Sequence, residues 1–133
     1  MSDAVAGMRT YLLTQSDVTN TTSRIYFSNL PQGVTLPAVV LEQSGDEIVR
    51  HLSNTTTLRR TTINVIAYAS THTVAASLGD VLTTAIEFDT GTWGSVSVRR
   101  AYVEGTVDLT EPPRDGSQIF RKVRSLMVIV WHT

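Results

Sequence analysis

The chain has 133 residues, of which 41% are hydrophobic, with a net charge of −1 and no cysteine. This length and apolar content suit one domain, residues 1–133, whose core needs no disulfide or metal. The near-neutral charge excludes a globally basic surface for nucleic acid, and the lack of cysteine excludes disulfides, thiolate metal sites and cysteine nucleophiles. Residues 1–15 lack the apolar core of a signal peptide, and no run of about 18 apolar residues occurs, so no membrane segment is expected.

The first third of the chain predicts one helix and two strands. Ser2 or Asp3 is a suitable N-cap, because either side chain can accept a hydrogen bond from a free backbone N–H group. Apolar residues then recur at helical spacing, namely Val5, Met8, Leu12 and Leu13. Residues 16–23 are polar and predict a turn, whereas residues 24–27 and 38–43 are rich in branched and aromatic side chains, which is typical of strands.

Residues 44–57 admit two interpretations. Ile48, Val49 and Leu52 would continue the preceding strand into a hairpin. The glycine, the asparagine and the three threonines of the same stretch favour a mobile loop. A long loop of this kind is either a functional segment or a solvated hairpin tip.

Residues 58–88 are the stretch around which the chain is organised. Ile63, Val65 and Ala67 alternate over 62–68 with a second set that includes polar and aromatic residues and Ile66. This period of two indicates a strand that is covered on one face and partly on the other. Ser70 or Thr71 then supplies an N-cap for the longest amphipathic helix of the chain. Its apolar stripe consists of Val74, Leu78, Val81, Leu82, Ala85 and Ile86. Residues 89–91 supply a helix stop.

The last third of the chain predicts two more strands. Residues 95–103 form the first, with a possible extension past a bulge at Gly105. A turn-rich break at residues 110–116 precedes a long strand at 118–131, whose second half is apolar on both faces, as expected for an interior strand covered on two sides. The predicted fold is therefore α+β, with a mixed, mainly antiparallel sheet, one long central helix and an N-terminal helix packed on it.

No pattern of catalytic or metal-binding residues is present. His51, His72 and His132 lie far apart and lack the spacing of metal ligands. The adjacent acids Asp46 and Glu47 would point to opposite faces of a strand, so they cannot share one catalytic site. No glycine-rich phosphate loop and no activated serine motif occur. We therefore expect no enzyme activity, no catalytic residue, no metal and no cofactor.

Basic residues gather in three places, at residues 59–60, 99–100 and 121–124. One interpretation is that they are solvated strand ends, because surface charges contribute little to stability. The other is that they form a charged face that contacts another subunit or lines a nucleic-acid lumen. The near-neutral net charge argues against independent, tight binding to DNA.

The order of these elements resembles a known family. Three features carry the resemblance. The first is the strand at 24–27, which leads through Leu30, Pro31 and Gln32 to the strand at 38–43, and the second is the strand at 65–68, which runs directly into the alanine-rich helix. The third is the D-L-x-E-P sequence at 108–112, which is followed by a basic strand that ends in Trp131. Together they resemble the tail completion, or tail terminator, proteins of long-tailed bacteriophages.

The resemblance implies a structural virion protein that is assembled in the host cytoplasm and acts at the neck of the particle. Its expected partners are other copies of itself in a homohexameric ring, the tail tube protein and the head completion or connector protein. It would cap the tube, end tube polymerisation and join tail to head, while DNA passes through the lumen without specific binding. The alternative is another head–tail connector or minor tail ring protein.

The interface of such a ring is expected to include five arginines that interrupt otherwise apolar strands. These residues are Arg59, Arg60, Arg99, Arg100 and Arg121. Exposed strand edges would be completed by a neighbouring copy, and head-to-tail contacts would close the ring.

Overall fold

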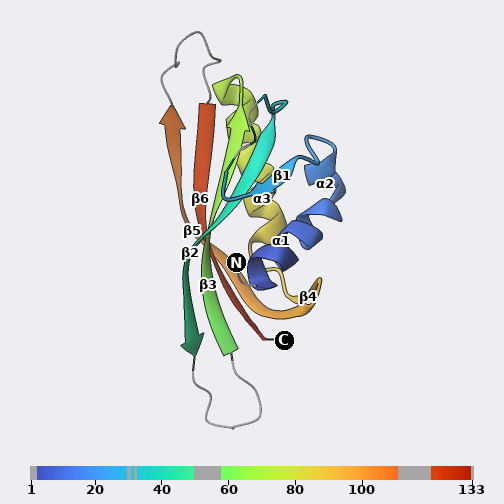
Figure 1. Ribbon diagram of the computed structural model, residues 1–133, viewed down its shortest axis with the longest axis vertical. Helices are drawn as coiled ribbons and strands as arrows, with labels where there is room; N and C mark the ends of the chain where they lie inside the picture. The colour runs from blue at the N-terminus through green and yellow to red at the C-terminus, as the bar shows by residue number, and fades with distance from the viewer. Residues whose placement is uncertain (1–2, 30, 32, 50–57, 111–120, 133) are drawn as a thin grey trace.

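The computed structural model describes residues 3–29, 31, 33–49, 58–110 and 121–132. This part of the chain contains three helices and six strands (Figure 1). In chain order they are α1 (Asp3–Leu13), α2 (Ser16–Thr19), β1 (Ile25–Phe27), β2 (Ala38–Val49), β3 (Leu58–Ala69), α3 (His72–Ile86), β4 (Gly91–Trp93), β5 (Val96–Thr110) and β6 (Arg121–His132).

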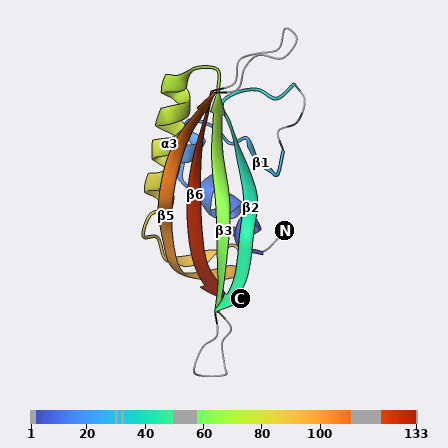
Figure 2. The ribbon, with the colours of Figure 1, turned by 90° about the vertical axis from the view of Figure 1, so that its left-hand side faces the viewer.

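The six strands form one sheet in the order β1-β2-β3-β6-β5-β4. β1 is parallel to β2, and the other neighbouring strands are antiparallel. The four long strands in the middle curl along their length, as Figure 2 shows. The prediction of an α+β fold with a mixed, mainly antiparallel sheet is confirmed.

The three helices lie on one side of this sheet (Figure 1). α3 packs on β3, β5 and β6, and α1 packs on β2, β4 and β5. Residues of both helices and of the sheet face beneath them form one buried core, which includes Met8, Leu12, Leu41, Ile63, Leu78, Leu82, Ile86, Met127 and Ile129. The other face of the sheet has no helix over it in the described part of the chain (Figure 2).

The start and the apolar stripe of α3 follow the sequence pattern closely. The Thr71 hydroxyl accepts a hydrogen bond from the backbone N–H of Val74 at 3.3 Å, which is the predicted N-cap. Leu78 and Leu82 of the stripe are buried. Val74, which was predicted to belong to the stripe, is 37% exposed, because the following Ala75 is the residue that the first turn buries.

α1 approaches β4 so closely that position 7 accommodates only glycine. A Cβ atom on Gly7 would lie 2.6 Å from the backbone oxygen of Trp93. The Trp93 ring is buried, stacks on Tyr11 with 4.7 Å between ring centroids, and donates its Nε1–H to Asp89 at 2.8 Å. The glycine therefore lowers the helix propensity of α1 but permits this close packing.

The structure extends β2 further than the loop interpretation of residues 44–57 predicts. The strand continues through Val49, and its ladder with β3 resumes after a bulge between Gln43 and Gly45. The loop interpretation is wrong for residues 44–49, because cross-strand ion pairs and a register that is continuous from Gly45 to Val49 hold this part of β2 against β3. Residues 50–57 lie outside the described residues.

The structure also tests the predictions for residues 16–23 and for the strand that begins near residue 95. The stretch at 16–23, predicted as a turn, contains the short helix α2, because the buried Val18 anchors it to the core. β5 continues past Gly105 to Thr110, so the possible extension of this strand is confirmed. Its register shifts near Arg99 and at Gly105, and the second shift confirms the predicted bulge. The predicted break at 110–116 lies outside the described residues beyond Thr110.

β6 is an interior strand, as predicted, because it pairs with β3 and β5. The sequence predicted that β6 is covered on both faces, but among the described residues helices lie over only one of them. Met127 faces the helices and is fully buried, whereas Val128 faces the other way and is 2% exposed although no described helix lies over it. Neighbouring side chains of the curled sheet therefore shield Val128.

Candidate assembly surfaces

The sheet face that points away from the helices has no helix over it among the described residues, and we call it the open face. The alternation of each strand assigns to it Val40, Glu42, Glu47, Arg60, Thr62, Asn64, Ile66, Tyr68, Arg100, Tyr102, Val107, Arg124, Leu126, Val128 and Val130. Its centre is apolar and shielded, since Val40, Ile66 and Val128 are 2%, 7% and 2% exposed. Charged side chains surround this apolar centre.

A shallow depression of about 420 Å³ lies on the open face near its β5 side. It is lined by Asn64, Glu104, Gly105, Val107, Arg124 and Leu126. Val107 is 45% exposed, which is high for a branched apolar side chain on a strand. The depression combines the apolar side chains of Val107 and Leu126 with the polar side chains of Asn64, Glu104 and Arg124.

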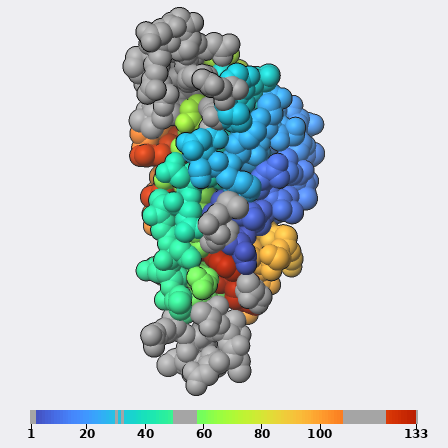
Figure 3. All heavy atoms as spheres, viewed as in Figure 1, coloured from blue at the N-terminus to red at the C-terminus, as the bar shows by residue number. Residues whose placement is uncertain are grey.

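The edges of the sheet are incompletely paired. β1 and β4 have three residues each and cover only part of β2 and β5. No described strand pairs with the outer side of β2 beyond Leu41, where Ile48 is 57% exposed. Figure 3 shows β2 as a column of atoms at the surface on this side. Such edges are sites at which another chain can add a strand.

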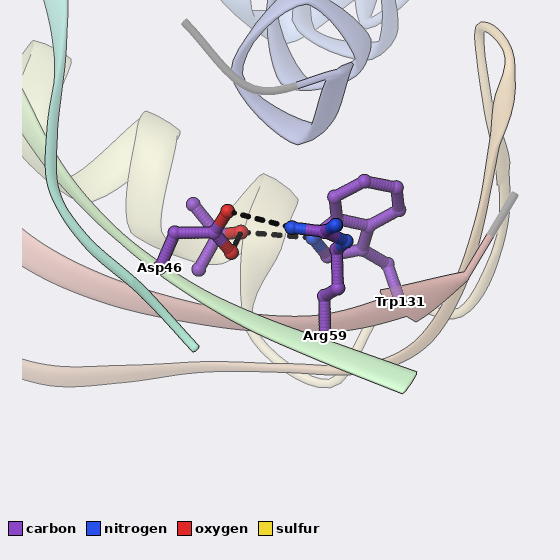
Figure 4. Close-up of polar contacts among 4 residues, drawn as sticks. Asp46, Arg59 and Trp131 are labelled. Atoms are coloured by element: carbon purple, nitrogen blue, oxygen red, sulfur yellow. Dashed lines mark hydrogen bonds and ion pairs between the residues drawn. The ribbon is translucent and has the colours of Figure 1, made fainter. Parts of the chain in front are cut away.

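A polar network ties β2, β3 and β6 together at one end of the sheet (Figure 4). Arg59 binds Asp46 at 3.1 Å, the Thr61 hydroxyl donates to the same carboxylate at 3.0 Å, and the Trp131 Nε1–H donates to Thr61 at 2.8 Å. Thr61 and Trp131 are buried, so each polar group needs its partner.

Arg60 binds Glu47 at 2.7 Å on the opposite face of the same strands. The adjacent acids Asp46 and Glu47 therefore serve two separate ion pairs, and the expectation that they do not share one site is confirmed.

The structure brings together two of the five predicted interface arginines. Arg60 and Arg100 flank Val130 in the same row of the open face, two strand spacings or about 10 Å apart. Arg100 also lies over the Tyr102 ring, with its guanidinium carbon 5.0 Å from the centroid. Arg59 points to the other side of the sheet.

The remaining two predicted arginines lie elsewhere. Arg99 is exposed at a bulge of β5. The backbone of Arg121 pairs with Ala69 and Thr110 at the far end of β6, and its side chain lies outside the described residues. The five arginines therefore do not form one patch, and their contacts with a partner remain a prediction.

On the helix side, a cleft of about 450 Å³ lies between α1, α2 and α3, and we call it the acidic cleft. It is lined by Tyr11, Gln15, Asp17, Asp80, Val81, Thr84, Ala85, Glu87, Phe88 and Asp89. These lining residues include four carboxylates and no cation. Burial, together with the negative charge of Asp89, raises the pKa of Tyr11 above its ordinary value near 10. The neutral Tyr11 hydroxyl donates to the backbone oxygen of Ala85 at 2.8 Å.

Phe88 lies at the rim of the acidic cleft and has an unusual conformation. Its φ of 61° is in the left-handed region, which costs a residue with a Cβ atom about 1–2 kcal/mol. Its side chain is 80% exposed, so the fold gains almost no burial from it. Sequence reasoning placed Phe88 only at the end of the α3 segment, because composition and periodicity carry no signal for backbone strain.

The described residues contain neither a cluster that could hold a metal ion nor a helix that could span a membrane. Among residues 3–29, 31, 33–49, 58–110 and 121–132, no group of three or more histidines or acids is placed to hold a metal ion. His72 and His132 lie on separate elements, α3 and β6, and His51 is outside the description. No described helix is long and apolar enough to cross a membrane.

The fold is similar to that of a chain in a solved virion structure. A chain from a solved structure, "Virion of native gene transfer agent (GTA) particle", aligns over 99% of this chain and 100% of that chain, with a TM-score of 0.57 and 11% identity. No curated protein sequence matches the chain. At this identity the structural match establishes the fold alone.

The family is established by sequence. The family model of tail completion protein gp17 matches residues 6–127, which is nearly the whole chain. The protein belongs to this tail completion family, and the resemblance seen in its sequence is confirmed. This membership supports a structural role in a phage tail.

Proposed function

We propose that this protein caps the tail tube of a long-tailed phage, ends tube polymerisation and joins the tail to the head connector. The observation that supports this most is the open face. It is a wide sheet surface with an apolar centre and no covering layer among the described residues, in a chain of the tail completion family. Around its shielded centre, Val107 is 45% exposed, and Ile48 at the unpaired β2 edge is 57% exposed. Exposed apolar side chains that gather on one surface are typical of protein interfaces.

We further propose that the subunit works as a homohexameric ring. Each copy has two different uncovered surfaces, the open face on one side and the helices on the other (Figure 1). One repeated subunit with two different surfaces forms head-to-tail contacts, and these end in a closed ring when the rotation between copies permits it. The ring lumen would let DNA pass without specific binding, consistent with a net charge of −1.

Three of the predicted arginines are suited to contacts with other subunits in this ring. Arg60 and Arg100 form a cationic row on the open face, and Arg99 is exposed beside them. Arginine is enriched at protein interfaces, because its planar fork binds carboxylates and stacks on aromatic rings. Arg59 and Arg121 are proposed to lie at the ends of the sheet, near the tube or the lumen.

Removal of this subunit from the phage tests the proposal. Electron microscopy of the resulting lysate is expected to show overlong tails that are detached from heads, because nothing would stop tube growth. Tails of normal length that lack heads would instead indicate the alternative, a connector or minor ring protein of the neck. Normal tails on intact particles would refute both assignments.

A further inference from the structure

We infer that Phe88 of each copy inserts into the open-face depression of the next copy in the ring. The inference rests on the ring of the proposed function and identifies the two surfaces that meet. The helix side of one subunit would contact the sheet side of its neighbour, with Phe88 as the apolar anchor and Val107 and Leu126 as its receiving surface.

The fold holds the backbone of Phe88 in place but gains almost no burial from its ring. Its backbone N–H donates to Ala101 at 2.9 Å, and the next N–H, that of Asp89, donates to Ile86 at 3.1 Å. On either side of Phe88, the Glu87 carboxylate accepts from the Val103 N–H at 3.0 Å and Asp89 accepts from Trp93. These contacts fix the backbone and leave the ring in solvent.

Glycine would adopt this φ without strain, so an aromatic residue here opposes local backbone preference. Backbone strain that the rest of the fold maintains is a feature of binding sites. Aromatic side chains, phenylalanine included, are also enriched in the core of protein interfaces. The unfavourable backbone and the 80% exposure of the ring are both explained if a partner buries it.

The charge of the surface beside Phe88 restricts the chemistry of its partner. The lining of the acidic cleft beside Phe88 carries Asp17, Asp80, Glu87 and Asp89 and no cation. Nucleic acid and anionic membranes are therefore repelled from this side. The partner needs an apolar recess with arginine near it, because arginine would pair with the carboxylates and pack on the aromatic ring.

The open-face depression meets these requirements. It contains the exposed Val107 beside Leu126, with the exposed Arg124 in its wall. No acidic partner of Arg124 is found within the described residues. Glu104 also lines the depression, so the pairing depends on Arg124 rather than on the net charge of the surface. The depression and Phe88 lie on opposite sides of one sheet, which is the arrangement that head-to-tail contacts require.

Cross-linking within assembled particles tests this contact directly, since the chain has no native cysteine. Phages carrying Thr84→Cys together with Glu104→Cys keep Phe88 and Val107 and are treated with a short thiol-reactive cross-linker. Thr84 lines the acidic cleft beside Phe88, Glu104 lines the depression, and both are exposed. The expected product is a ladder of multimers up to the full ring. The matched control, Val74→Cys with Glu104→Cys, places a thiol elsewhere on α3 and is expected to give no ladder. Particles that assemble but give no ladder with the first pair would overturn the inference.

A second variant separates anchoring from folding. Phe88→Gly removes the ring and the backbone strain together, so the isolated subunit is expected to have a Tm equal to or above that of the parent. Its assembly on tube ends is expected to need at least about tenfold more protein. Val74→Ala, which trims another exposed apolar side chain of α3, is expected to leave assembly unchanged. If Phe88→Gly assembles like the parent chain, the inference is wrong.

Charge reversal gives an independent check. Arg124→Glu is expected to weaken assembly, and adding Asp80→Lys in the same chain is expected to restore part of it, because the reversed charges would meet between copies. If the double variant is no better than the single one, the two faces do not meet as inferred. Cross-linking and assembly of the variants are measured independently of tail length. Tails of normal length in the absence of the subunit would therefore refute the proposed capping role but would not refute the contact between copies.

Discussion

Replacing Thr61 by valine tests the polar network that joins β2, β3 and β6. The substitution keeps the shape of the side chain but removes the hydroxyl that accepts from Trp131 Nε1 and donates to Asp46. The indole is 3% exposed, so water cannot easily replace the lost acceptor. An unsatisfied buried donor costs about 1–3 kcal/mol, whereas Asp46 keeps its bond to Arg59.

The expected loss in the free energy of unfolding is therefore about 2 kcal/mol, or a decrease in Tm of roughly 6–10 °C for a domain of this size. Urea unfolding followed by circular dichroism measures it without relying on tryptophan fluorescence. Thr62→Val is the matched control, because this hydroxyl faces the other way and has no partner among the described residues. A loss under about 0.5 kcal/mol for Thr61→Val, or an equal loss for Thr62→Val, would refute the reasoning.

Three further predictions concern α1 and α3. Gly7→Ala is expected to lower the free energy of unfolding by about 1–3 kcal/mol, because overlap with the Trp93 carbonyl outweighs the gain in helix propensity. Gly105→Ala is the control and is expected to be near neutral, because the space around this residue is open. Equal effects of the two substitutions in denaturant titrations would contradict this reasoning. Thr71→Ala is expected to cost about 1 kcal/mol in the same assay through loss of the N-cap, and no loss would mean that water replaces it. Because the pKa of Tyr11 is raised in the folded state, this hydroxyl ionises at a lower pH in the unfolded chain than in the folded protein. The stability that the neutral hydroxyl contributes is therefore fully present below about pH 10 and is lost as the pH rises through the pKa of the folded state. The stability advantage of the parent over Tyr11→Phe is therefore expected to be smaller at pH 11 than at pH 9, and an equal or larger advantage would be inconsistent with the shift.

Elements with strong periodicity could be predicted from sequence. The N-cap at Thr71 and the buried stripe of α3 follow from residue type and spacing, because a helix with one apolar face has few ways to pack. The bulge at Gly105 and the interior place of β6 follow in the same way from a lone glycine and a doubly apolar strand.

Features that depend on pairing across the sheet could not be predicted. The extension of β2 to Val49 depends on ion pairs with β3, whose register is invisible in a linear pattern. The apolar residues on both faces of β6 predicted two covering layers, but side chains of the curled sheet shield Val128. The candidate anchor Phe88 was missed for a related reason, since its significance lies in its φ and its exposure.

We have proposed that this chain is a ring subunit at the head-proximal end of the tail tube. A cryo-electron microscopy reconstruction of the particle neck tests it most directly. We expect a single ring of six copies between the tube and the head connector, with Phe88 of each copy buried on the open face of the next. Density for this chain at any other place in the particle, or its absence from the particle, would contradict the account.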